Sequence, residues 1–239
     1  GYDYATAIGL ALDQIAAATE RLVGRQAPHQ LTIATTPSFA AKWLVPRLID
    51  FQGRHPDLEV RLVTANALTD LARHDIDVAV RYGLGDWPGV TATPLMETDL
   101  FPVFSPRFIE RGPPLREPGD LAQHVLLRLL HDEWPRWLRH AGLSEATLRE
   151  AEAWRPGPRY ADAGLMIQAA LAGQGVALGQ RVLVADDLAA GRLMQPFATT
   201  LPSESRYWLV MRPGSRGAPK VRDFRAWLET TIEGMTAVG

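Results

Sequence analysis

Cysteine is absent from this chain of 239 residues, which excludes disulfide bonds, thiolate metal sites and cysteine nucleophiles. Lysine is nearly absent as well, because only Lys42 and Lys220 are lysine among the 25 basic residues. We interpret this arginine bias as a trace of genomic base composition. No apolar run reaches the roughly 18 residues that a membrane span requires, and no secretory signal is present. The first residue is not Met, so we expect a fragment or a processed form.

A strong charge of one sign is also missing, since 25 Lys plus Arg against 27 Asp plus Glu leaves a net charge of −2. Phosphate binding needs a net basic face to release counterions, so this balance argues against direct nucleic-acid binding by this chain. Hydrophobic residues make up 46% and charged residues 22%, which indicates a folded protein rather than a disordered one. The length suits two domains of roughly 100–200 residues each.

Motifs for catalysis and for metal or nucleotide binding are missing too. No two histidines have metal-ligand spacing, and His131-Asp132-Glu133 stands where a helix begins, which favours N-terminal capping. No Walker loop and no G-x-S-x-G elbow occurs. The glycines of Gly173–Gly179 end a helix and open a strand, the reverse of the dinucleotide order, so Gly173 or Gly175 is predicted to cap that helix. We interpret Asp186-Asp187 as a solvated helix face, and we predict no cofactor, no metal and no catalytic residue.

The first thirty residues carry the seam of an amphipathic helix. Apolar residues recur there at alternating steps of three and four, and opposite them stand Asp13, Gln14, Glu20 and Arg21. Under three heptads is short for a free coiled coil, so this helix needs something to pack on. Two interpretations remain open, namely a helix that pairs with another subunit and a helix that lies on its own domain.

Strands and helices alternate from Leu31 onward. Strands are predicted at residues 31–35, 58–64, 76–81, 90–96, 100–104, 125–129, 157–161, 176–179 and 206–211. Helices are predicted at residues 38–54, with Pro46 restarting or kinking the run, and at 68–74, 133–141, 163–172, 181–190 and 219–233. The order of the first strands and helices, up to residue 104, predicts an α/β fold with a largely parallel sheet whose faces are covered. Joints near residues 101–106 and 203–207 divide it into two sub-domains, and the cleft between two such lobes is the usual small-molecule site.

Two junctions between a strand and a helix have the chemistry of a binding site. At Thr35-Thr36-Pro37-Ser38 the free N–H groups of a helix start favour an anion, and the hydroxyls of Thr36 and Ser38 are able to bond a carboxylate. Ser38 as a mere N-cap is the alternative. At the second junction, residues 160–164, Asp162 is predicted to be the N-cap. If both junctions face one cleft, a ligand with an acid at one end and an amine or hydroxyl at the other fits.

Several segments together resemble the effector-binding domain of LysR-type transcriptional regulators, most of all the regulators of the glycine-cleavage operon and of chromosomal β-lactamase. They are Pro37–Leu48, Arg54–Asp57, Asp75–Gly83, Gly85–Gly89, Phe104–Pro106, Gly173–Gly179 and Leu188–Leu193. The resemblance covers residues 31–235. It departs at Ala163 and Gly164, where the β-lactamase regulators carry hydroxyls.

The resemblance implies an α/β fold of two Rossmann-like lobes joined by two crossover strands, as in type 2 periplasmic binding proteins. Residues 1–28 are then a linker and dimerisation helix, residues 31–103 with 207–239 form regulatory lobe I, and residues 104–206 form regulatory lobe II. A winged helix-turn-helix domain is expected before Gly1, so DNA is contacted only through that absent domain.

The resemblance also implies a bacterial, cytoplasmic ligand sensor that is not an enzyme, does not meet a membrane, and forms a homodimer and, at full length, a tetramer. Its effector is expected to be a small carboxylate or amino acid-like molecule bound between the lobes. The effector-binding residues it implies are Thr36, Pro37, Ser38, Ala65, Asn66, Arg81, Tyr82, Trp87, Tyr160, Ala161, Asp162 and Ala163, and the oligomerisation residues are Ile8, Leu12, Ile15 and Leu22. A solute-binding protein of a transport system is the alternative, and an enzyme on the same scaffold is a third.

Overall fold

The computed structural model describes residues 29–64, 76–110, 112–151, 154, 156–212 and 217–236. The predicted N-terminal helix, with Ile8, Leu12, Ile15 and Leu22, lies outside these residues, and so do Ala65, Asn66 and the predicted helix 68–74. The chain divides into two compact units. Unit 1 comprises the described residues up to Thr36, those of Arg47–Met96 and those from Tyr207 onward. Unit 2 comprises Pro37–Pro46 and Glu97–Arg206.

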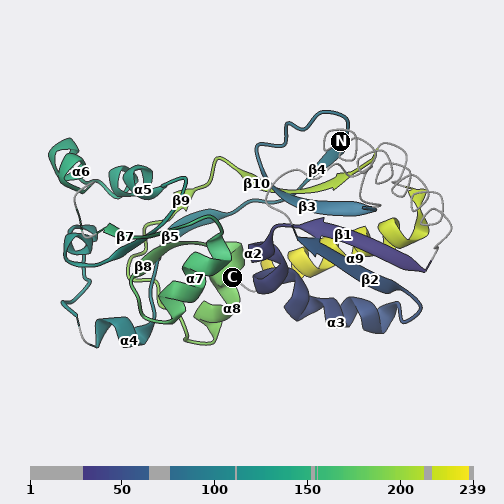
Figure 1. Ribbon diagram of the computed structural model, residues 1–239, viewed down its shortest axis with the longest axis horizontal. Helices are drawn as coiled ribbons and strands as arrows, with labels where there is room; N and C mark the ends of the chain where they lie inside the picture. The colour runs from purple at the N-terminus through teal and green to yellow at the C-terminus, as the bar shows by residue number, and fades with distance from the viewer. Residues whose placement is uncertain are drawn as a thin grey trace, which may run out of the picture. The chain divides into compact units, whose positions relative to one another are not determined.

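Unit 1 is built on a five-stranded sheet of order β2-β1-β3-β10-β4 (Figure 1). Its strands are β1 Gln30–Thr35, β2 Glu59–Thr64, β3 Val78–Gly83, β4 Thr91–Met96 and β10 Arg206–Met211. β1 runs parallel to β2 and β3, whereas β10 runs antiparallel to β4. The sheet is therefore mixed, and the last strand of the chain returns to the first sheet.

The helices of unit 1 pack through aromatic rings. In α3, Val45–Arg54, the ring of Phe51 lies 5.4 Å from Phe224 and 5.3 Å from Trp227 of α9, Pro219–Thr236. The indole N–H of Trp227 donates to Asp50 Oδ2 at 2.8 Å. Figure 1 shows α9 in yellow beside β1 and β2. Phe224 and Trp227 thus hold the last helix, which the sequence predicts at residues 219–233, against α3.

Unit 2 has its own five-stranded sheet, of order β7-β6-β8-β5-β9. Its strands are β5 Asp99–Val103, β6 Leu126–Leu129, β7 Pro156–Tyr160, β8 Val176–Gln180 and β9 Leu201–Pro202. β6 is parallel to β7 and β8, while β5 is antiparallel to β8 and β9. The sequence did not predict β9, nor α4 Pro106–Ile109, the 3-10 turn η2 Pro118–Gln123 and α6 Glu145–Ala151, which are all short elements.

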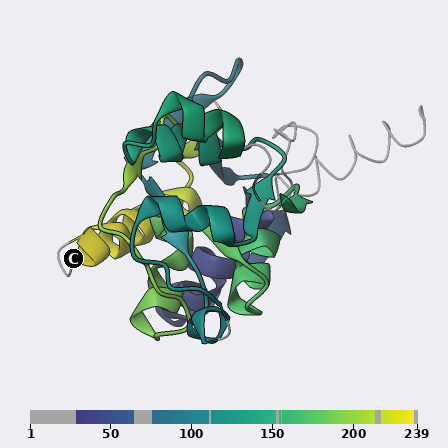
Figure 2. The same cartoon turned by 90° about the vertical axis from the view of Figure 1, so that its left-hand side faces the viewer.

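Helices cover both faces of the sheet in unit 2. Because successive strand residues point to opposite faces, Leu126, Val176 and Leu178 share a core with Trp134 and Trp137 of α5, Trp134–His140. The neighbouring residues of these strands face α7, Ala163–Leu171, and α8, Arg181–Ala189. Figures 1 and 2 show α5 and α6 on one side of these strands and α7 and α8 on the other.

Residues 37–54, predicted as one helix from 38 to 54, form three consecutive pieces instead. They are α2 Pro37–Phe39, a π-helical turn η1 Ala40–Leu44, and α3. Pro46 has no N–H for the carbonyl four residues earlier, and its ring crowds that carbonyl, so the chain widens just before it. The predicted break is thus a π-turn before Pro46 rather than a kink at it.

The two units group two segments differently from the predicted lobes. Residues 37–46, predicted in lobe I, cluster with unit 2, and so do residues 97–103. The second border between the units falls between Arg206 and Tyr207, the same position as the predicted border between the lobes. The segment 37–46 is attached to unit 2 because α2 contacts α7 and η1 contacts α8. The division into regulatory lobes with the predicted bounds stays a prediction.

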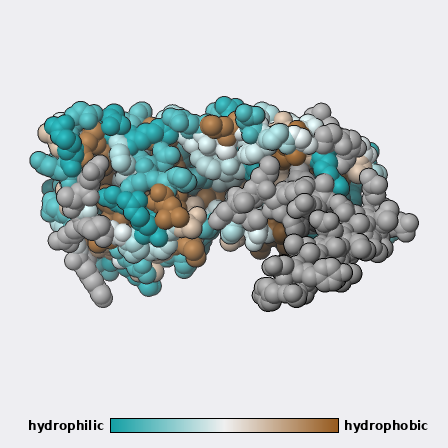
Figure 3. All heavy atoms as spheres, turned by 45° about the horizontal axis from the view of Figure 1, so that its top comes forward, coloured by the Kyte–Doolittle hydropathy of each residue, from teal (hydrophilic) through white to brown (hydrophobic). Residues whose placement is uncertain are grey.

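The surface carries few large apolar side chains in the described part. Those that are exposed are Val45, Ile49, Leu84, Leu130, Leu165 and Met194. Figure 3 shows hydrophobic residues as small groups among hydrophilic ones on one face. Among the residues that the structure describes, no helix has the length and apolar character to cross a membrane.

Candidate functional site

Two predicted site segments, 125 residues apart in numbering, meet within unit 2. A Cβ on Gly164, in the first turn of α7, would lie 3.3 Å from Ser38 Cα. Because α2 begins at Pro37, Ser38 stands inside its first turn, buried, and the alternative of Ser38 as a helix-capping residue ahead of this helix is wrong. Pro37 and Ser38 therefore share a unit with Asp162 and Ala163, through direct packing of α2 on α7.

Asp162 caps α7, as the sequence predicted. Its Oδ1 accepts a hydrogen bond from the Gly164 N–H at 2.8 Å. Within the described residues its other oxygen, Oδ2, has no hydrogen-bond partner, which leaves an acceptor at the carboxyl end of β7. A carboxylate only accepts hydrogen bonds, so this position suits a ligand amine or hydroxyl rather than a ligand acid.

The helical segment that carries Ser38 is held in place by a buried ion pair. Lys42 Nζ lies 3.0 Å from Asp187 Oδ2 of α8, and Arg192 Nε lies 2.7 Å from Asp187 Oδ1. Asp187 is only 4% exposed, so the interpretation of both Asp186 and Asp187 as a solvated face is wrong for Asp187. The physical reason is its partner Lys42, which lies far away in sequence and neutralises the carboxylate in the interior.

Two of the predicted residues of unit 1, Thr36 and Arg81, lie toward the carboxyl end of its parallel strands. Thr35 pairs with Val80, so Thr36 and Arg81 follow at the same edge. Arg81 is 3% exposed, and burial lowers the pKa of its guanidinium. Removal of a cation from water is costly, so a buried arginine at a strand end is suited to an anionic group.

The two aromatic residues predicted in unit 1 are packed against neighbouring rings. The Tyr82 ring lies 5.0 Å from that of Tyr207, and the Trp87 ring meets Trp208 edge-on at 6.3 Å. From the sequence, Tyr207 is predicted only to lie near the joint at residues 203–207. An aromatic residue at the start of a strand that returns to the first sheet was the signal that could have placed it beside Tyr82.

The remaining predicted residues follow the same division. Tyr160 and Ala161 lie in unit 2 at the end of β7, and the Tyr160 hydroxyl donates to Gln174 Oε1 at 3.5 Å, which is a long contact. The structure thus groups Thr36, Arg81, Tyr82 and Trp87 in unit 1, and Pro37, Ser38, Tyr160, Ala161, Asp162 and Ala163 in unit 2.

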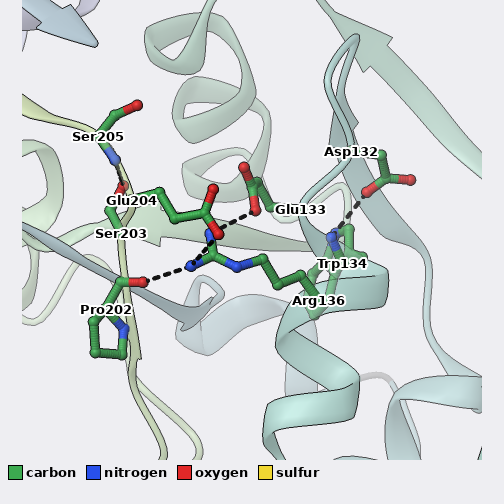
Figure 4. Close-up of polar contacts among 8 residues, drawn as sticks. All are labelled: Asp132, Glu133, Trp134, Arg136, Pro202, Ser203, Glu204 and Ser205. Atoms are coloured by element: carbon green, nitrogen blue, oxygen red, sulfur yellow. Dashed lines mark hydrogen bonds and ion pairs between the residues drawn. The ribbon is translucent and has the colours of Figure 1, made fainter. Parts of the chain in front are cut away.

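The His131-Asp132-Glu133 cluster caps a helix, as predicted. Asp132 Oδ1 accepts from the Trp134 N–H at 3.0 Å at the start of α5 (Figure 4). Arg136, one turn further on, donates to the Pro202 carbonyl at 3.0 Å and pairs with Glu204 at 3.4 Å (Figure 4). No group of metal-ligating side chains occurs among the described residues.

The C-terminal end of α7 also follows the sequence prediction. Gly173 has φ +73, the left-handed conformation that glycine adopts without steric cost just after a helix. Its N–H donates to the Ala170 carbonyl at 2.9 Å. Gly173 therefore lets the backbone leave the end of α7 and turn toward β8.

Comparisons with known proteins point to one family. The family model described as LysR substrate binding domain matches residues 24–232. The glycine cleavage system transcriptional activator of Escherichia coli is 36% identical over 232 residues, which is 95% of this chain and 73% of that protein. The transcriptional activator AmpR of Pseudomonas aeruginosa is 40% identical over 220 residues, which is 90% of this chain and 70% of that protein.

A solved structure gives the same result. The X-ray structure of the effector domain of AmpR from Pseudomonas aeruginosa matches with a TM-score of 0.71 and 34% sequence identity. The match covers 88% of this chain and 99% of that one. The predicted fold class, two α/β lobes of the periplasmic-binding-protein type, is confirmed by this match and by the two mixed sheets.

Proposed function

We infer the function from one premise, which is that the chain belongs to the LysR substrate-binding domain family. Its relatives described above are transcriptional activators rather than solute-binding proteins of transporters. The chain is accordingly the ligand-sensing domain of a LysR-type transcription regulator. This family match, sustained over most of the chain, is the observation that carries the function. Regulators of this kind bind small-molecule effectors and act as oligomers with DNA.

The predicted strand-end residues are, in this proposal, the effector contacts. In unit 1 these are Thr36, Ala65, Asn66, Arg81, Tyr82 and Trp87, and in unit 2 they are Pro37, Ser38, Tyr160, Ala161, Asp162 and Ala163. Buried Arg81 favours an acid group, and the open oxygen of Asp162 favours an amine or hydroxyl. A small carboxylate or amino acid-like effector has both groups.

Ser38→Ala tests the residue assignment. In a thermal-shift screen of small acids and amino acids, a true effector raises the melting temperature of the wild-type chain because it binds the folded state. Loss of one hydrogen bond to a charged ligand group should weaken that effector about 12- to 160-fold. Ser205→Ala, at a serine of unit 2 outside these segments, is the matched control and should bind normally. If Ser38→Ala and Asn66→Ala both bind a stabilising ligand as the wild type does, the assignment is wrong.

Oligomerisation and the rest of the regulator complete the proposal. We place the subunit contact at Ile8, Leu12, Ile15 and Leu22, the seam of the predicted linker helix, with DNA bound through a helix-turn-helix domain of the full-length regulator. The chain works in the cytoplasm, where a regulator meets DNA, and it carries no catalytic activity. Size-exclusion chromatography of a Leu12→Asp, Ile15→Asp double variant checks the seam, since a polar seam should shift an oligomer toward the monomer.

A further inference from the structure

A cavity of about 140 Å³ lies in unit 2, on the sheet face that α5 and α6 cover. It is lined by Arg128, Trp134, Pro135, Leu138, Arg139, Glu145, Leu148 and Arg149. None of these is among the proposed effector contacts. Since α7 packs on the opposite face, the sheet of unit 2 separates the cavity from Ser38 and Asp162.

The floor of the cavity is apolar. Trp134, Leu138 and Leu148 are at most 8% exposed and belong to the core of unit 2. The Trp134 indole N–H donates to the Leu127 carbonyl at 2.9 Å, so its one polar atom is already used. An apolar cavity of about 150 Å³ in another protein accommodates benzene. A chain of about four carbons or a small ring therefore matches the size and chemistry of this floor.

The rim of the cavity is cationic. Arg128, Arg139 and Arg149 all line it, against the single lining carboxylate of Glu145. Arg128 Nη1 pairs with Asp132 Oδ2 at 3.0 Å, and Arg139 Nε pairs with Glu145 Oε1 at 3.2 Å. Exposed Arg149 makes no hydrogen bond or ion pair with any other described residue. Among the described residues, Arg128 and Arg139 each have a carboxylate partner, whereas Arg149 has none.

The buried member of this rim is rigidly held. Arg128 follows Leu126 by two residues on β6, so its side chain shares the core face, and it is 7% exposed. Its partner Asp132 is itself fixed, because the other oxygen of Asp132 caps α5 (Figure 4). Arg159 approaches Asp132 at 3.8 Å from β7 and adds positive charge nearby. Arg128 is therefore an ordered positive charge beside the cavity.

From the apolar floor and the exposed guanidinium of Arg149, which has no partner among the described residues, we propose that unit 2 holds a second ligand site, for a small monocarboxylate with a short apolar chain or ring. The carboxylate meets Arg149 and Arg139 at the rim, because planar guanidinium groups match the two oxygens of a carboxylate. The apolar part lies against Trp134, Leu138 and Leu148. This proposal does not depend on the proposed effector site.

Titration of the full chain with pentanoate, followed by ¹H–¹⁵N NMR, tests the site. The amides of residues 128–149 should shift together, while those of residues 36–38 and 160–164 should not. In R149Q the dissociation constant should rise about fivefold, the effect of losing one partly exposed charge pair. Because Arg149 is exposed, R149Q keeps the fold, which circular dichroism verifies.

One control variant and two ligand analogues test whether binding needs both the rim charge and the apolar floor. Arg222, an exposed arginine of α9 paired with Asp223, gives the control variant R222Q, which should bind pentanoate as the wild type does. Pentanamide keeps the chain without the charge and acetate keeps the charge without the chain, and both should bind more weakly. The proposal is overturned if the amides of residues 128–149 do not respond, if R149Q binds as the wild type does, or if pentanamide binds as tightly as pentanoate.

Discussion

Unit 1 and unit 2 have sheets of equal strand number, yet each uses its one lysine–aspartate pair for a different connection. In unit 1, Lys220 of α9 reaches Asp77 at 2.8 Å and the Gln30 carbonyl at 2.6 Å, and so ties the last helix to the first strand. In unit 2, Lys42 reaches Asp187 and fixes the segment 37–46 on α8. The first pair joins elements within unit 1. The second pair attaches to α8 a segment, residues 37–46, that follows directly from β1 of unit 1. Ser38 is consequently positioned by unit 2.

The largest test of this comparison is Asp187→Ala. It leaves Lys42 largely buried without its partner, and we expect a loss of about 3–5 kcal/mol in the free energy of unfolding. Urea unfolding followed by tryptophan fluorescence measures the loss, and hydrogen exchange should place it in α8 and residues 37–46. Asp77→Ala should instead loosen β1 and α9. Asp186→Ala, at the exposed neighbour, should change stability by less than about 0.5 kcal/mol, and an equal loss there would contradict the assignment.

Two glycines with positive φ give the second test. Gly85 in unit 1 has φ +95, and a Cβ there would overlap the Trp208 ring. Gly173 in unit 2 has φ +73, and a Cβ there would make only an ordinary contact, 4.0 Å from the Phe108 backbone nitrogen. Gly85→Ala should cost about 2–5 kcal/mol, the sum of a backbone and an overpacking penalty. Gly173→Ala should cost only about 1–2 kcal/mol for the backbone. Thermal unfolding of both variants measures the two losses of stability. Equal losses would contradict the prediction, because they would mean that the Trp208 ring moves aside at no cost.

The smallest expected effect is a pH dependence at Asp120 in unit 2. The backbone N–H groups of Arg116 and Glu117 donate to Asp120 Oδ2 at 2.8 and 3.1 Å, and they lower the pKa of this carboxyl below 3.8. A pKa that is lower in the folded state stabilises the fold above the unfolded value, and the benefit disappears as pH falls through the folded value.

The melting temperature of Asp120→Asn should therefore lie below that of the wild type at pH 7, and the difference should shrink below about pH 4. Calorimetry between pH 7 and pH 2 measures it. Asp57→Asn serves as the control in unit 1, because exposed Asp57 makes no hydrogen bond or ion pair among the described residues. A difference for Asp120→Asn that stays constant across this range would refute the prediction.

Local features of the fold were predictable from the sequence. The Asp162 cap and the Gly173 turn each depend on residues a few positions apart, so the local sequence alone indicates them. The burial of Asp187 was not predictable, because its partner Lys42 is 145 positions away. The π-turn at residues 40–44 was not predictable either, because a proline predicts that a helix is interrupted but not which backbone conformation the interruption takes.

The candidate site shows the same limit. Spacing placed Ser38 and Asp162 at helix starts, but their meeting in unit 2 depends on α2 packing against α7. The family resemblance supplied the effector residues as a set, and no local pattern could have done so. The position of Arg149 at a cavity was not predicted, because nothing in the neighbouring sequence distinguishes an arginine that lines a cavity from one that faces only solvent.

The scarcity of lysine has a practical consequence for measuring this molecule. Lys42 and Lys220 are the only lysines, one in each unit, and both side chains are less than one fifth exposed and engaged in ion pairs. An acylating reagent attacks a free, deprotonated amine, so each of these lysines reacts mainly when its pair opens. Peptide masses after brief acylation would then report separately how often each of the two ion pairs opens, without any substitution in the chain.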